Sequence, residues 1–133
     1  MRCCLAAFAL ISAALTAPAF AAPSPDPAKV ANAQAGLSDY QDVLSDISCD
    51  APVLTAHKLM CDNDLLWQMG LLDSWAWVYA TENATGTRAD HDNPAWDDIF
   101  IEERDSCADE ACLAKVLIRH TNDSLGSTSP YDP

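Results

Sequence analysis

The chain has 133 residues, with 20 acidic and seven basic side chains and a formal net charge of −13. A chain this acidic repels nucleic acid and anionic lipid surfaces, so neither is expected as a partner. Long-range attraction favours a basic protein, but solubility or adaptation to salt explains the acidity equally well. The length allows one compact domain behind a short leader, but not two.

Residues 1–21 have the features of a secretory signal peptide. Arg2 supplies the positive charge, residues 5–15 form an apolar run, and Ala19-Phe20-Ala21 is an A-x-A cleavage site. The apolar run is shorter than the roughly 18 residues that a membrane span needs, and no later segment is longer, so no span is expected. We therefore expect a periplasmic or secreted protein whose mature chain begins at residue 22.

Apolar residues recur at helical spacing through most of the remaining chain, and no segment alternates as a strand would. A proline-rich tether at 22–27 precedes the first helix, residues 83–94 have no apolar run and predict a loop, and a tail at 127–133 is expected to be disordered. The predicted helices span 28–47, 53–61, 64–82, Asn93-Pro94 to about 105, and 109–125. The sequence thus predicts a monomeric all-α domain at 28–126, a small bundle of four to five helices clipped by two disulfides.

Four cysteines follow the leader: Cys49, Cys61, Cys107 and Cys112. An even number in an exported chain indicates two disulfides, and three pairings are possible. We favour the pairs 49–61 and 107–112, because each would close one corner between helices. No histidine lies at ligand spacing from either pair, which disfavours zinc.

The stretch around the second cysteine pair places charges where helix ends favour them. Arg104 lies near the end of the predicted helix that includes Trp96, Ile99 and Phe100 on its inward side. Asp109 and Glu110 lie in the first turn of the next helix, where negative charge complements the helix dipole. These charges therefore have a structural explanation that requires no ligand.

No catalytic motif is present. His57, His91 and His120 lie on different predicted elements, without a nucleophile motif to accompany them. Glu102, Glu103 and Asp105 fall on a predicted solvated helix face. We expect no enzymatic activity, no cofactor and no metal.

Several residues together resemble the LprI-type lysozyme-inhibitor N-terminal domain, over about residues 49–125. They are Cys49, Thr55, Lys58, Met60-Cys61 and the run from Phe100 through Arg104-Asp105-Ser106-Cys107 to Cys112-Leu113. The family consists of small, secreted, mostly bacterial helical domains with cysteine pairs. The resemblance implies non-covalent binding to a basic lysozyme, with Phe100, Arg104 and Asp105 as a structural motif. The chain departs from the family pattern at Phe100, Leu117 and His120, where tryptophan, tyrosine and arginine are usual.

If a lysozyme is bound, we expect the contact surface in the acidic loop and helix start and at the 107–112 corner. The residues proposed for it are Asp90, His91, Asp92, Asn93, Asp97, Asp98, Asp109 and Glu110. His91 and Asn93 are the groups expected to enter a lysozyme cleft, whose floor carries acids and would repel carboxylates. The alternative is a structural or accessory periplasmic domain with no enzymatic target.

Overall fold

The computed structural model describes residues 24–131 and confirms the all-α prediction. The predicted signal peptide at 1–21 and residues 132 and 133 lie outside the described residues. The described part contains five α-helices: α1 (Pro27–Gly36), α2 (Thr55–Asp62), α3 (Asp64–Thr85), α4 (Asp98–Asp105) and α5 (Glu110–Leu125). Two short 3-10 turns, η1 (Ser38–Tyr40) and η2 (Gly126–Thr128), follow α1 and α5. Within 24–131, no helix is long and apolar enough to cross a membrane.

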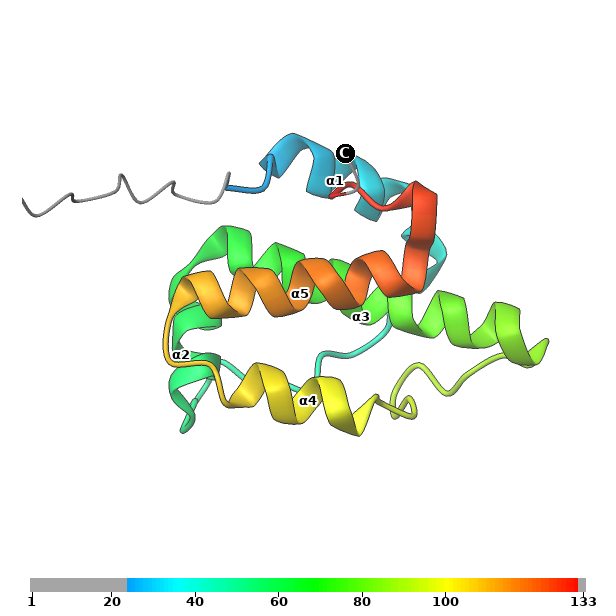
Figure 1. Ribbon diagram of the computed structural model, residues 1–133. Helices are drawn as coiled ribbons and strands as arrows, with labels where there is room; N and C mark the ends of the chain where they lie inside the picture. The colour runs from blue at the N-terminus through cyan, green and yellow to red at the C-terminus, as the bar shows by residue number, and fades with distance from the viewer. Residues whose placement is uncertain (1–23, 132–133) are drawn as a thin grey trace, which may run out of the picture.

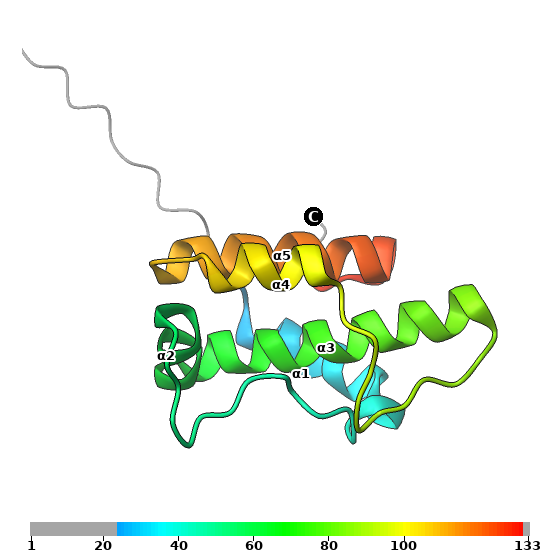
Figure 2. The same cartoon turned by 90° about the horizontal axis from the view of Figure 1, so that it is seen from below.

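The helices α3 and α5 form the centre of the molecule and have the most extensive contact of any pair. They run in the same direction, with α1 on one side of them and α4 returning antiparallel on the other (Figure 1). The helix α2 closes the end at which α3 and α5 begin (Figure 2). The core is apolar and its fully buried side chains are mainly from α3 and α5, among them Met69, Leu72, Val78, Leu113 and Leu117.

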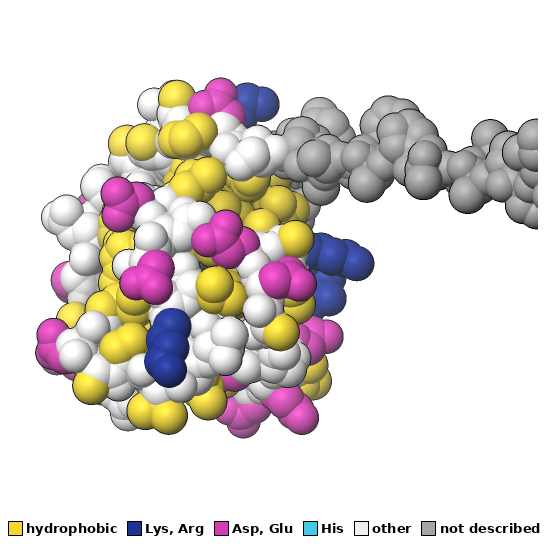
Figure 3. All heavy atoms as spheres, turned by 90° about the vertical axis from the view of Figure 1, so that its left-hand side faces the viewer, with side chains coloured by type: hydrophobic (Ala, Val, Ile, Leu, Met, Phe, Trp, Pro, Cys, Tyr) yellow, Lys and Arg dark blue, Asp and Glu magenta, His cyan; other side chains and the backbone are white. Residues whose placement is uncertain are grey.

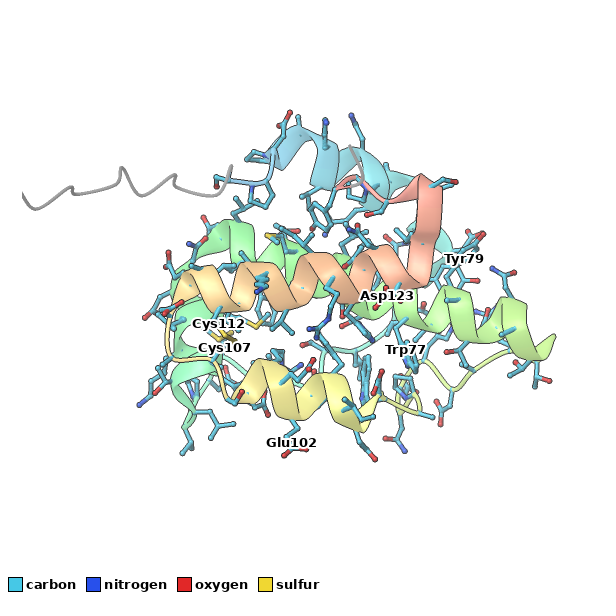
Figure 4. All side chains as sticks on the ribbon, in the orientation of Figure 1. Trp77, Tyr79, Glu102, Cys107, Cys112 and Asp123 are labelled. Atoms are coloured by element: carbon cyan, nitrogen blue, oxygen red, sulfur yellow. A yellow bond between two sulfur atoms is a disulfide. The ribbon has the colours of Figure 1, made fainter. Side chains whose placement is uncertain are left out.

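Both disulfides have the predicted pairing. Cys49 bonds Cys61 and Cys107 bonds Cys112, with Cα–Cα distances of 5.7 and 5.5 Å. The second pair closes the turn between α4 and α5 (Figure 4). The first ties the segment before α2 to the last turn of that helix.

The first predicted helix, 28–47, is wrong beyond residue 36. Asp26 caps α1, as Asp26 followed by Pro27 at the first helical position predicts, but the helix ends at Gly36. The hydroxyls of Ser45 and Ser48 then accept hydrogen bonds from the backbone N–H groups two residues on. Such local bonds give the backbone an alternative to the helix, so 41–54 is irregular.

The helix predicted to start at Asn93-Pro94 instead starts at Asp98. The Ala95 carbonyl accepts a hydrogen bond from the Trp77 indole N–H at 2.8 Å. This tertiary hydrogen bond stands where a helix would place a backbone hydrogen bond. The Asp97 carboxylate is the cap, because it accepts from the N–H groups of Ile99 and Phe100. The prediction that Ile99 faces inward is also wrong, since 73% of this residue is exposed.

The predicted loop at 83–94 is shorter at its start, because α3 continues to Thr85. The Thr85 hydroxyl donates to the Thr81 carbonyl, and Gly86 ends the helix in the left-handed conformation with φ of 67°. The loop that joins α3 to α4 therefore comprises 86–97.

The prediction of a disordered tail is wrong for residues 127–131. Ser129 is buried and bonds Asn122, and the Tyr131 ring packs against the core cluster. Burial raises the pKa of the Tyr131 hydroxyl.

This tail should contribute to stability. A chain that ends at Thr128 should have a free energy of unfolding about 2 kcal/mol lower than one that ends at Tyr131, because it loses the burial of an aromatic ring. Urea unfolding followed by circular dichroism measures the difference. Equal stability of the two chains would show that the tail packing is not formed in solution.

Candidate functional site

Arg104 lies at the centre of a polar cluster that joins α4 to distant parts of the chain. The residue is 4% exposed. Its guanidinium donates to both carboxylate oxygens of Asp46 at 2.9 and 2.7 Å, and its Nε donates to Asp105 at 2.9 Å. Asp105 also contacts His57 of α2 at 3.0 Å. Planar bidentate geometry of this kind requires arginine.

The charge of Arg104 is well compensated. Burial disfavours the charged form, but the hydrogen bonds with Asp46 and Asp105 outweigh it and raise the pKa of Arg104 above its ordinary value. The guanidinium also lies 5.6 Å from the centre of the Phe100 ring. Asp46 was expected inside a helix, so its role as the main partner of Arg104 was missed from the sequence.

A second buried group also contacts Phe100. His120 stacks on Phe100, with 3.9 Å between ring centres, and its Nδ1 contacts the Asp73 carboxylate at 2.9 Å. The Thr121 hydroxyl donates to the same carboxylate at 2.8 Å. Burial raises the pKa of Asp73, although the bond with His120 opposes that shift. Phe100 and His120, two departures from the family pattern, are therefore in direct contact.

The buried cluster has little room for a ligand. The void lined by Asp73, Phe100 and Arg104 has a volume of about 10 Å³, which is at the lower limit for one water molecule. Among residues 24–131, no group of three or more His, Cys, Asp or Glu side chains is placed to hold a metal ion. Arg104 and Phe100 are buried and Asp105 bonds both Arg104 and His57, so these side chains make their contacts within the fold.

His91 does not extend freely from the acidic loop. It is 8% exposed, and its two ring nitrogens contact Asp42 at 2.7 Å and Glu82 at 3.2 Å. Its backbone carbonyl accepts from the Leu44 N–H. The expectation that His91 enters a lysozyme cleft is therefore wrong, because the side chain fastens the loop to α3 and to the irregular segment.

The His91 contacts shift the pKa values of the whole group. The hydrogen bond with Asp42 raises the pKa of His91, with burial and Arg88 opposing it. The pKa of Asp42 is lowered by its bond with His91, and that of Glu82 is lowered chiefly by the Ala89 N–H. The pKa of Tyr40 is raised by burial and by its bond to Glu82. Bonds from both ring nitrogens to carboxylates indicate a doubly protonated imidazole.

The remaining residues of the proposed contact surface fall into two separate groups. Asp90, Asp92 and Asn93 are exposed in the loop 86–97 and Asp98 is exposed at the start of α4, whereas Asp109 and Glu110 lie past the other end of α4. Eight helical residues span about 12 Å, so the two groups do not form one patch.

Two of these acids also have structural roles. Asp97 caps α4, and Asp109 caps α5 by accepting from the Cys112 N–H at 2.8 Å. Replacing either of them would therefore damage a helix end before it changed a surface.

Exposed groups on α4 form a more compact candidate for a binding surface. Asp98 and Glu102 are four residues apart and so lie on one side of the helix, and Glu102 points away from the body of the molecule (Figure 4). Ile99 lies beside them. Ile99 was missed because the helical spacing suggested that it faced inward. We call Asp98, Ile99 and Glu102 the outer face of α4.

Comparison with known proteins adds no relative. We found no family model that matches the chain, and no curated protein or solved structure that is significantly similar to it. The resemblance to the LprI-type domain therefore depends on the cysteine spacing and on the motif around Arg104.

The Arg104 cluster should contribute much more to stability than a surface ion pair does. Arg104→Ala should lower the free energy of unfolding by about 3 kcal/mol, since it leaves two carboxylates without their partner. Arg104→Lys should retain less than half of the stability that Arg104→Ala loses, because an ammonium cannot bond both oxygens of Asp46 in the same plane. Urea denaturation measures both variants.

The matched control for this prediction is Arg119→Ala, which removes the exposed ion pair between Arg119 and Glu103. Arg119→Ala should lower the free energy of unfolding by less than about 1 kcal/mol. Equal losses for Arg104→Ala and Arg119→Ala would show that the Arg104 cluster is not a structural centre.

The His91 contacts should make stability depend on pH. The pKa of His91 is raised in the folded state. The stabilisation that His91 provides is therefore complete below its unfolded-state pKa of about 6.5, and it is lost as the pH rises through its folded-state pKa. The lowered pKa values of Asp42 and Glu82 act in the opposite sense, so their contribution is lost as the pH falls below about 4.5. The stability difference between the wild type and His91→Gln should therefore be largest between about pH 5 and 6.5 and shrink on either side. Urea unfolding from pH 4 to 9 measures it, and a difference that does not change with pH would contradict the arrangement.

Proposed function

We propose that this chain is a periplasmic or secreted protein-binding domain of the lysozyme-inhibitor type, which acts by non-covalent binding to a basic lysozyme. The observation that carries the proposal is the outer face of α4. There, an exposed apolar side chain lies beside two carboxylates that make no ion pair with any residue in 24–131.

This arrangement suits a cationic protein partner. Ile99 supplies apolar area that would leave water on binding, and such central side chains carry most of the binding energy at interfaces. Asp98 and Glu102 supply negative charge that accelerates encounter with a positive surface. Since the rest of α4 packs on α5 and α2, this face is the one that remains for a partner.

The loop at 86–97 offers a second contact beside the start of α4. It encloses with α3 a hollow of about 450 Å³, lined by Asp90 and Asn93 and also by Arg88. The hollow has room for a side chain of a partner. Asn93 is exposed and uncharged, and we propose it as the group that enters the lysozyme cleft.

A lysis assay tests the activity itself. The purified domain should inhibit the hydrolysis of purified peptidoglycan by a basic lysozyme at moderate salt, and an unrelated protein of equal net charge should not. Binding should weaken as salt rises, because surface charges are screened beyond about 10 Å at 0.1 M. A weak association that leaves hydrolysis unchanged would favour the accessory-domain alternative.

Two sets of variants test the surface. Asp98→Lys with Glu102→Lys should lower the association rate about tenfold at low salt. The control pair Asp39→Lys with Asp62→Lys changes the net charge equally at exposed positions of η1 and α2, and should have a smaller effect. Ile99→Ser should raise the dissociation rate about tenfold, and Val53→Ser, at another exposed apolar residue, should leave it unchanged. Surface plasmon resonance measures these rates. Equal effects of the paired variants would place the contact elsewhere.

A further inference from the structure

An apolar groove lies on the side of the molecule opposite α4. It has a volume of about 840 Å³ and is bounded by α3, α5 and the residues Ser24 and Pro25 that precede α1. The helix α1 packs chiefly on α3 and leaves the flank of α5 open. In the view of Figure 3, hydrophobic side chains gather just beneath α1, toward the edge where α5 lies.

The groove stays open because small residues of α5 face it. Ala111 and Ala114 lie on its α5 wall, three residues apart and so on one side of the helix. Leu65 of α3 lies on the facing wall together with the fully buried Met69, and Ile118 continues the apolar surface along α5. An open groove of this size, between helices and lined by apolar side chains with a few polar groups, has the dimensions of a site for a small ligand.

The charges at the groove are opposite in sign to the rest of the protein. Lys115 and Arg119 both line it, although the whole chain has only seven basic residues against 20 acidic ones. Lys115 makes no ion pair with any residue that the structure describes, and Arg119 pairs only with the exposed Glu103. Glu110 is the one acidic residue among those that line the groove. The groove therefore combines an apolar floor with a cationic edge in an otherwise anionic molecule.

We propose that this groove binds one long-chain fatty acid. The alkyl chain lies along the floor between α3 and α5, and its carboxylate contacts Lys115 and, in competition with Glu103, Arg119. Burial of the chain provides affinity that grows with its length, and the cations select the anionic headgroup. The proposal is independent of the proposed lysozyme binding. The groove is bounded by the residues that precede α1, and α1 and α4 lie on opposite sides of the α3–α5 pair (Figure 1).

Calorimetric titration with carboxylates of eight, ten and twelve carbons, below their micelle concentrations, tests the site. One molecule should bind per chain, and affinity should rise up to about fourfold per methylene, which corresponds to about 0.8 kcal/mol. An alkyltrimethylammonium ion of equal chain length should bind at least about tenfold more weakly than the carboxylate. Absence of saturable binding, or equal binding of the cationic amphiphile, would overturn the proposal.

Paired variants locate the ligand. Ala111→Trp fills the groove from an exposed position and should weaken binding at least about tenfold, whereas Ala84→Trp, at the far end of α3, should not change it. Lys115→Glu should weaken binding of the carboxylate about fivefold, and Lys58→Glu, which changes the net charge equally outside the groove, less than twofold. Circular dichroism checks that each variant is folded. Equal effects within either pair would place the ligand elsewhere and overturn the proposal.

Two other occupants give different results. If the groove is a contact between two copies of the chain, sedimentation will show a dimer that Ala111→Trp dissociates and fatty acid binding will be absent. If residues before Ser24 occupy it, the full-length chain will bind no fatty acid and a chain that begins at residue 22 will bind it. Either result overturns the proposal for the full chain.

Discussion

The rest of this structure depends on the bidentate contact between Arg104 and Asp46. The segment 41–54 has no repeating hydrogen bonds of its own, so its path is fixed by the contacts it makes elsewhere. Arg104 of α4 bonds to Asp46 of this segment, and the Cys49–Cys61 disulfide links the segment to α2. His91 of the loop 86–97 contacts the start of the segment. Because Arg104 is buried, losing it would leave charges without partners at the point where α2, α4 and this segment meet.

The acidity of the chain has two physical consequences that act on different residues. Asp26, Asp97 and Asp109 accept hydrogen bonds at the starts of α1, α4 and α5, so their charge is used within the fold. Asp98 and Glu102 make no such bonds and face solvent. The net charge therefore overstates the number of carboxylates that are available to a basic partner. Exposed carboxylates without bonds in the fold, such as Asp98 and Glu102, can attract such a partner without a loss of folding stability.

The α3–α5 pair separates two surfaces with different chemistry. On one side, the short helix α4 presents an exposed isoleucine among carboxylates, which suits a cationic protein. On the other, α1 leaves an apolar groove edged by Lys115 and Arg119, which suits an anionic amphiphile. Since the two surfaces share no residue, a substitution at one of them should leave the other intact.

Local features of the sequence predicted the helical class, favoured the two disulfide pairs that the structure has and predicted the cap at Asp26, because these depend on residues close together in the chain. Contacts between distant residues decided the rest. The Trp77 indole donates a hydrogen bond to the Ala95 carbonyl, and α4 starts only after this residue. Serine hydroxyls and Arg104 bond to the segment 41–54, which is irregular where its apolar spacing predicts a helix. The burial of His91 and the exposure of Ile99 likewise depend on which elements pack beside them. A pattern of apolar spacing gives the faces of a helix, but only the packed structure determines which face is covered.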